Sequence, residues 1–216
     1  MMETEPLRFG TLGPAGTNHE LATRNYMQAH GLSQATLEIF PAFEACMDLL
    51  GAGQLEFVVQ NAAHPDYVKT LVGRLKKGIS LVDTFIAKTK PMGIVTRVDV
   101  PEPVSIGYIV ATQDYFDTSA WRHRVLTSSN ADTANRLIDG EFDSGFTSIE
   151  MAEKNPGRFR VHTYVGAVDS VWVVYARQHL DFGPIVLCRN APVRSLFNPA
   201  DRYSEDTKAY TGSSHE

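Results

Sequence analysis

The sequence predicts an α/β fold with two lobes, and three observations lead to this. Short apolar runs alternate with amphipathic runs over residues 7–77, as in strands connected by helices. A second series of the same kind follows the break at Pro101-Glu102-Pro103. Extended segments at 79–86 and 92–95 join the two series. We therefore expect parallel sheets in two lobes, with a cleft between them at the carboxyl ends of the strands.

The first series has clear helix boundaries. Gly31 follows an amphipathic run, and glycine is favoured just past a helix end. Pro41 suits the first turn of the next helix, which Gly51 ends. The predicted strands are 7–12, 37–40 and 57–59, and the predicted helices are 18–30, 41–50 and 66–77.

The second series is read in the same way. Ser129 and Asp132 have the spacing of a capping box, so a helix is expected to begin there and to end at Gly140. The segment 148–154 predicts a short helix. The predicted strands are 104–110, 144–146, 159–162 and 171–175.

Composition excludes several classes of protein. The chain has 216 residues, enough for one large or two-lobed domain. Its net charge is −5 and it has no long basic run, which argues against a nucleic-acid partner. No apolar run is long enough to cross a membrane, and the acidic, polar start is unlike a signal peptide. Cys46 and Cys188 lie in apolar runs without metal spacing. We expect a cytoplasmic protein with reduced thiols.

The turn from Leu12 to Glu20 is the first candidate for a binding site. Glycines and a proline connect a strand to a helix that Thr17 or Asn18 can cap. The free N–H groups at Gly16 and Thr17, together with the positive helix end, suit a carboxylate or a phosphate. The alternative is an ordinary strand–turn–helix connection that binds nothing.

Two histidines are the titratable candidates on the predicted cleft. The loops expected there are 13–19, 61–64 and 128–130, together with Thr112. A histidine beside a bound carboxylate can be cationic and act as an anchor or an acid, which is the role considered for His19 and His64. The alternative is that each is an exposed loop residue without a role. Their spacing is not that of metal ligands.

Several segments resemble the prephenate dehydratase domain. They are Leu12-Gly13-Pro14-Ala15-Gly16-Thr17, residues 43–46, 56–59, 128–134 and 140–143. The resemblance covers roughly residues 7–176. It implies a fold like the type II periplasmic binding proteins and a site for prephenate, a cyclohexadiene with two carboxylates. It also implies a domain over 6–190, with crossovers near 86–92 and 164–171, and a C-terminal tail over 191–216.

The chain departs from that family at positions that matter for chemistry. His19 stands where the dehydratases usually have serine, and Ala63 and His64 replace an asparagine and a serine. The family's Thr-Arg-Phe aligns near Ser170-Val171-Trp172, so the hydroxyl is kept and the cation is lost. The regulatory ACT domain is absent from the chain.

A closer resemblance is to the branch of this family that decarboxylates prephenate without aromatising it, in the bacilysin pathway. That branch has a segment like Thr89 to Arg97 and a tryptophan near Trp172. The resemblance implies a carboxy-lyase that acts on a small carboxylate substrate without cofactor or metal, and a homodimer. Two alternatives stay open: a dehydratase on such a substrate, and a non-catalytic cytoplasmic binding module for an aromatic or dicarboxylate ligand.

The predicted site residues follow from these readings. Some have a structural alternative: helix capping for Thr17, a core position for Trp172 and the start of a strand for Ser170. The predicted catalytic residues are His19 and His64. The predicted substrate-binding residues are Gly16, Thr17, Asn61, Thr89, Met92, Ser170 and Trp172.

Overall fold

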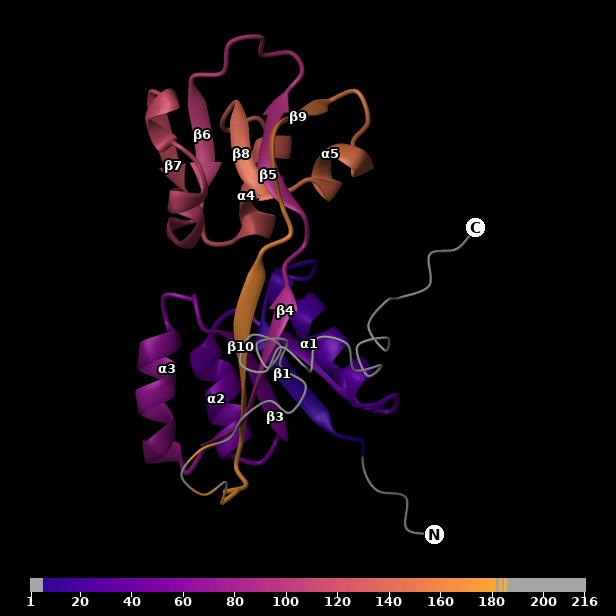
Figure 1. Ribbon diagram of the computed structural model, residues 1–216, viewed down its shortest axis with the longest axis vertical. Coiled ribbons are helices and arrows are strands. Elements are labelled where there is room, and N and C mark those ends of the chain that lie inside the picture. The colour runs from indigo at the N-terminus through magenta and orange to yellow at the C-terminus, as the bar shows by residue number, and fades with distance from the viewer. Residues whose placement is uncertain (1–5, 182, 184, 186–216) are drawn as a thin grey trace, which may run out of the picture. The chain divides into compact units, whose positions relative to one another are not determined.

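The computed structural model describes residues 6–181, 183 and 185 (Figure 1). The described residues up to His179 form one compact unit. The predicted boundary at 190 and the predicted tail lie outside the described residues, as does Cys188.

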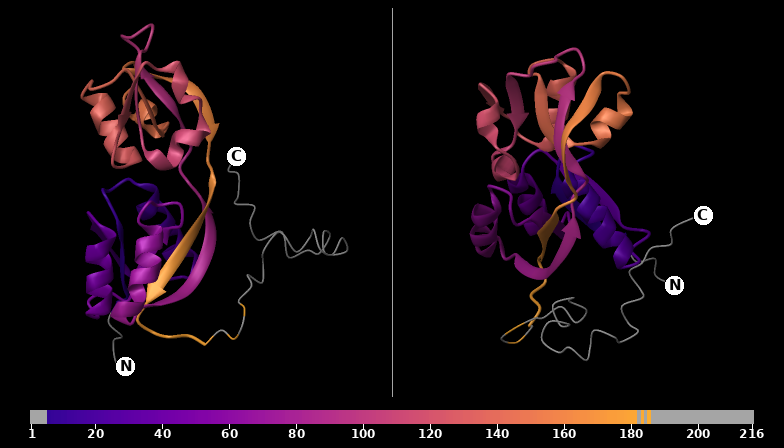
Figure 2. Two further views of the ribbon diagram at one scale, coloured as in Figure 1. Left: turned by 90° about the vertical axis from the view of Figure 1, so that its left-hand side faces the viewer. Right: turned by 45° about the horizontal axis from the view of Figure 1, so that its top comes forward.

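The compact unit contains two five-stranded sheets, which confirms the predicted α/β class with two sheets. The first sheet has the strand order β2-β1-β3-β10-β4. Figure 2 shows β4 and β10 running side by side. Its strands are β1 (Arg8–Leu12), β2 (Thr36–Phe40), β3 (Phe57–Asn61), β4 (Ser80–Lys88) and β10 (Asp169–Ala176). Its helices are α1 (Asn18–Ala29), α2 (Phe43–Gly51) and α3 (Tyr67–Gly73), the last continued by the 3-10 turn η1 (Arg74–Lys77).

The second sheet has the order β7-β6-β8-β5-β9. Its strands are β5 (Met92–Arg97), β6 (Ser105–Tyr108), β7 (His123–Leu126), β8 (Ser144–Ser148) and β9 (Phe159–Gly166). Its helices are α4 (Asn130–Ile138) and α5 (Glu150–Lys154), with the 3-10 turns η2 (Val110–Tyr115) and η3 (Thr118–Ala120) between β6 and β7.

The prediction of parallel sheets is wrong for part of each sheet. Strand β1 pairs in parallel with β2 and β3, and β6 pairs in parallel with β7 and β8. Strand β10 is antiparallel to β3 and β4, and β5 is antiparallel to β8 and β9. The reason is the connectivity of the chain. Strand β10 returns to the first sheet from the second and lies between β3 and β4, both of which run in the opposite direction.

The chain passes between the sheets twice. The passages lie between β4 and β5 and between β9 and β10. Thr89 joins them, since its N–H donates to the Val168 carbonyl at 2.9 Å and its Oγ1 accepts from the Val168 N–H at 3.0 Å. These paired bonds hold the two crossing segments together.

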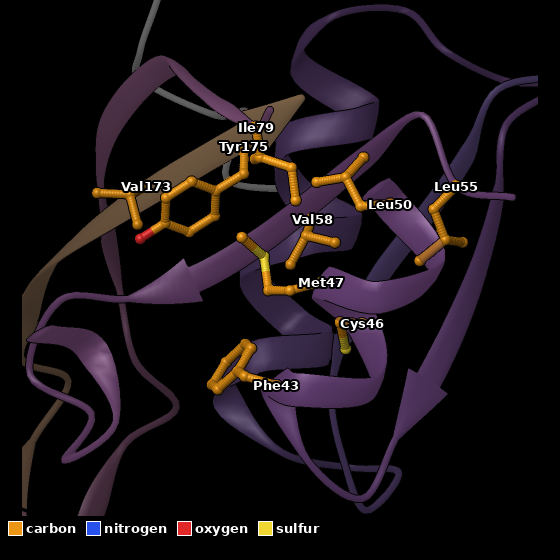
Figure 3. Packing of buried hydrophobic residues seen from close by; sticks show 9 residues of the cluster. All are labelled: Phe43, Cys46, Met47, Leu50, Leu55, Val58, Ile79, Val173 and Tyr175. Carbon is orange, nitrogen blue, oxygen red and sulfur yellow. The ribbon is translucent and has the colours of Figure 1, made fainter. Parts of the chain in front are cut away.

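Both faces of the first sheet are packed by helices. One face packs against α2 in the cluster drawn in Figure 3, where Val173 and Tyr175 of β10 meet helix residues such as Leu50. Trp172 and Val174 point to the other face, where they meet residues of α1. This alternation explains why β10 reads as a nearly continuous apolar run.

The caps of two helices and the state of Cys46 agree with what the sequence predicts. Thr17 caps α1 by accepting from the Glu20 N–H, and Ser129 caps α4 by accepting from the Asp132 N–H at 3.0 Å. Cys46 is a buried free thiol, and burial raises its pKa to about 12. No helix in the described part of the chain is long and apolar enough to span a bilayer.

Candidate functional site

A pocket of about 480 Å³ lies where several parallel strands end. Such an edge is the usual ligand position in open α/β sheets, because the loops that leave the strands gather there. His64 and Asp66 line it from the loop after β3, and Ser128 and Ser129 line it from the segment before α4. The other lining residues follow β1 and β2: Leu12, Gly13, Pro14, Ile39, Phe40, Pro41 and Ala42.

The two predicted histidines belong to one cluster of rings. The centroid of the His19 ring lies 5.6 Å from that of His64, 5.4 Å from Phe43 and 5.2 Å from Trp172. Phe43 also meets His64 edge-on at 5.1 Å. Phe43 lies in the helix that the sequence predicts over 41–50. The structure therefore brings together two imidazoles, one from the first turn of α1 and one from the loop after β3, among aromatic rings.

His19 is a neutral imidazole in this setting. Its Nε2 accepts a hydrogen bond from the backbone N–H of Asn61 at 3.3 Å. Removal from water, together with the nearby His64, lowers its pKa from 6.5 to about 3. In the protein without ligand the lowered pKa favours the neutral ring over the cationic anchor or acid considered from the sequence. A role for the neutral ring stays a prediction.

His64 is less enclosed and lines the pocket directly. Its Nδ1 accepts from the backbone N–H of Asp66 at 3.1 Å. Burial lowers its pKa, and the Asp66 carboxylate partly offsets this. The neutral form is thus favoured here too, although less strongly than for His19.

Asn61 connects the cluster to β10. Its Nδ2 donates to Ser170 Oγ at 2.7 Å, and its Oδ1 accepts from the Ala63 N–H at 2.8 Å. The side chain is therefore held between two strands of the sheet. Oδ1 and one hydrogen of Nδ2 are engaged by the protein, and a direct ligand contact of Asn61 stays a prediction.

The turn before α1 binds an anion from the chain itself. The Glu20 carboxylate accepts from the Gly16 N–H at 2.7 Å and from Arg24 Nε at 2.9 Å. The bond from Gly16 is the leading reason that the pKa of Glu20 is lowered. Thr17 donates to the Leu12 carbonyl at 3.3 Å and caps the helix. The Gly16 N–H and the Thr17 hydroxyl are therefore engaged within the chain, and ligand binding at the Thr17 N–H stays a prediction.

Comparisons with known proteins find relatives in sequence and neighbours in fold. No family model matches the sequence. The chain is 24% identical over 191 residues to the prephenate decarboxylase of Bacillus subtilis (strain 168), which covers 81% of this chain and 89% of that protein. The prephenate decarboxylase of Bacillus amyloliquefaciens is also 24% identical, over 190 residues, covering 79% of this chain and 87% of that one.

Solved structures give the fold. The prephenate dehydratase from Arthrobacter aurescens, solved in complex with L-Phe, matches with a TM-score of 0.61 and 16% identity. The match covers 81% of this chain but only 61% of that one, so the chain spans less than two thirds of the dehydratase. An ABC transporter protein from Parabacteroides distasonis matches with a TM-score of 0.51 and 11% identity, over 80% and 68% of the two chains. The chain has a prephenate dehydratase-like fold.

Within this prephenate dehydratase-like fold, two predicted binding residues lie in the core. Met92 is 2% exposed and Trp172 is 1% exposed, so neither presents a surface to a ligand in this structure. Met92 packs inside the second sheet's cluster, and Trp172 donates from Nε1 to the Ala87 carbonyl at 3.4 Å. For both, a direct contact with substrate stays a prediction, and the structure shows a core position. Trp172 still contacts His19, which places it behind the imidazole.

Other residues expected on the cleft serve the scaffold. Thr89 holds the crossing segments through Val168, as described above. Thr112 does not line the pocket, and its Oγ1 donates to the Ile109 carbonyl at 3.0 Å. Lys90, which follows Thr89, pairs with Glu150 at 3.2 Å.

The sequence reasoning missed the part of the pocket wall formed by residues 39–42 and Asp66. The signal was available, because these residues also follow the carboxyl ends of parallel strands. Within residues 6–181, 183 and 185, no three or more His, Cys, Asp or Glu side chains come together as a metal site.

Proposed function

We propose that this protein is a carboxy-lyase that decarboxylates prephenate, or a related carboxylated cyclohexadiene, and keeps the ring hydroxyl. The observation that carries the proposal is the sequence similarity to prephenate decarboxylases across most of both chains. The fold, which is similar to that of a prephenate dehydratase, supports a site for the same kind of ring acid.

The proposed reaction needs no acid to protonate a leaving group, because CO₂ is the only group that leaves. The bond between the ring carbon and its carboxylate breaks, CO₂ leaves, and the electron pair enters the ring diene. A proton then adds to a ring carbon, and the hydroxyl stays in place. A weakly solvated, aromatic setting favours this step, because a carboxylate loses more hydration there than neutral CO₂ does. Of the clustered rings, His64 lines the pocket, and Phe43 and His19 pack against it.

The same residues disfavour a dehydratase. Dehydration needs an acid that protonates the departing hydroxyl, and a well-positioned acid contributes about 10²–10⁴-fold. A neutral imidazole is a weak acid, and both histidines favour the neutral state. Val171, near the position where the dehydratases carry arginine, supplies no charge.

The proposal includes a small carboxylate as the substrate, no cofactor, a homodimer and a cytoplasmic location. These rest on the resemblance to the decarboxylases and on the composition of the chain. Size-exclusion chromatography with light scattering tests the homodimer.

The activity is tested by incubating purified protein with prephenate and following CO₂ and phenylpyruvate together, against a protein-free sample. The proposed decarboxylase releases CO₂ without phenylpyruvate. Equal amounts of both products would identify a dehydratase instead. A ligand-dependent rise in melting temperature with neither product would identify a binding module.

A further inference from the structure

The loop that leaves β3 fixes both imidazoles through backbone N–H groups. Asn61 N–H donates to His19 Nε2, and Asp66 N–H donates to His64 Nδ1. A backbone N–H can only donate, so the accepting ring nitrogen carries no hydrogen in the neutral imidazole. The hydrogen of His19 is therefore on Nδ1 and that of His64 is on Nε2. The two rings are held as opposite tautomers.

Both N–H groups remain available to a ligand. Among the described residues, neither His19 Nδ1 nor His64 Nε2 has a hydrogen-bond partner. His19 and His64 are both partly exposed, and His64 keeps 20% of its side-chain surface accessible. A neutral imidazole N–H offers one hydrogen bond to an acceptor oxygen.

Asn61 prepares a third donor in the same way. Ser170 Oγ accepts from Asn61 Nδ2, which leaves the hydroxyl hydrogen of Ser170 free to donate elsewhere. The bond from the Ala63 N–H to Asn61 Oδ1 determines which end of the amide faces Ser170. One residue thus orients His19 through its backbone and Ser170 through its side chain.

We propose that Asn61 is a positioning residue that holds His19 and Ser170 as neutral donors to a 2-oxo acid side chain, alongside His64. This rests on the proposed function, because prephenate carries such a side chain beside the carboxylate that leaves. The ketone and the retained carboxylate both offer acceptor oxygens. Neutral donors hold them without placing a cation beside the departing carboxylate, where it would stabilise the ground state.

The tautomers are tested in the free protein, so that the result does not depend on turnover. Long-range ¹H–¹⁵N correlation spectra at neutral pH are expected to show Nδ1–H for His19 and Nε2–H for His64. Phenylpyruvate, a stable 2-oxo acid, is then the probe. Its addition is expected to shift both imidazole N–H signals saturably.

Variants separate positioning from general damage to the fold. Ser170→Ala removes the third donor and is expected to weaken phenylpyruvate binding about tenfold with the tautomers unchanged, and Ser170→Thr is expected to restore it. Asn61→Asp removes the Nδ2 donor and adds a negative charge beside His19. The Ser170 hydroxyl is then expected to donate to the new carboxylate, which weakens phenylpyruvate binding. The added charge is expected to move the titration of His19 to higher pH. Asn25→Asp makes the same charge change on an exposed position of α1 and is expected to alter neither.

An Nε2–H tautomer for His19, or imidazole signals that do not respond to phenylpyruvate, would overturn the positioning role. Saturable shifts without CO₂ release from prephenate would uphold it and instead refute the proposed decarboxylase activity.

Discussion

The neutral state of His19 has a consequence for stability that can be measured without any substrate. The folded protein keeps His19 neutral down to a pKa of about 3, whereas in the unfolded chain its pKa is 6.5. Between these values the unfolded state binds one more proton than the folded state does. The free energy of unfolding therefore falls by about 1.4 kcal/mol for each pH unit of acidification below 6.5.

The expected size follows directly. Between about pH 7.5 and pH 5, His19 alone accounts for a loss of about 2 kcal/mol. This loss of stability changes little if the folded-state pKa is about 4 instead of 3, because the folded-state imidazole is still neutral at pH 5 in both cases. His64 contributes in the same direction, since burial lowers its pKa also.

The assay is urea denaturation of the protein and of His19→Gln at both pH values. The variant removes the titrating group, so its stability is expected to fall by about 2 kcal/mol less than that of the parent protein. Any constant cost of the substitution cancels in this difference. His123→Gln, at an exposed position, is the control and is expected to follow the parent. Equal losses in the parent and in His19→Gln would refute the assignment of a neutral His19.

Three further predictions concern the scaffold. Gly107→Ala places a Cβ 2.2 Å from the buried Phe142 ring and is expected to lower the free energy of unfolding by about 1–3 kcal/mol, measured by urea denaturation. In the control Gly73→Ala the new Cβ meets nothing within 4 Å, so this variant is expected to be neutral or slightly stabilising. Ser129→Ala removes the cap of α4 and is expected to lower stability by about 1 kcal/mol, and an unchanged melting curve would contradict the capping role. In a variant whose other cysteine is serine, Cys46 is expected to resist a thiol reagent until the protein unfolds, and rapid labelling of the native protein would contradict its burial.

Much of the fold was predictable because the local signals are strong. The periodicity and the caps gave the helices that begin at Asn18 and Asn130 to within a residue or two. The pattern failed for β7, whose His123 and Arg124 are exposed at a sheet edge and therefore lack apolar alternation. The antiparallel strands were missed because strand direction depends on how the chain returns between sheets, which no local pattern records.

The site was predictable in position but less so in chemistry. The rule that ligands lie beyond the carboxyl ends of strands located His64 and the segment that contains Ser129. It did not reveal that Glu20 satisfies the Gly16 N–H, because that bond depends on a side-chain conformation. Nor did it reveal the neutral state of His19, which is a result of tertiary packing against rings from three other elements.

The most direct test of the proposed function is a proton NMR time course of purified protein with prephenate, corrected for spontaneous breakdown. The proposal predicts loss of prephenate signals together with a product that keeps vinylic ring protons and the carbinol proton beside the hydroxyl. Aromatic signals of phenylpyruvate, or prephenate signals that decay no faster than in buffer, would contradict it.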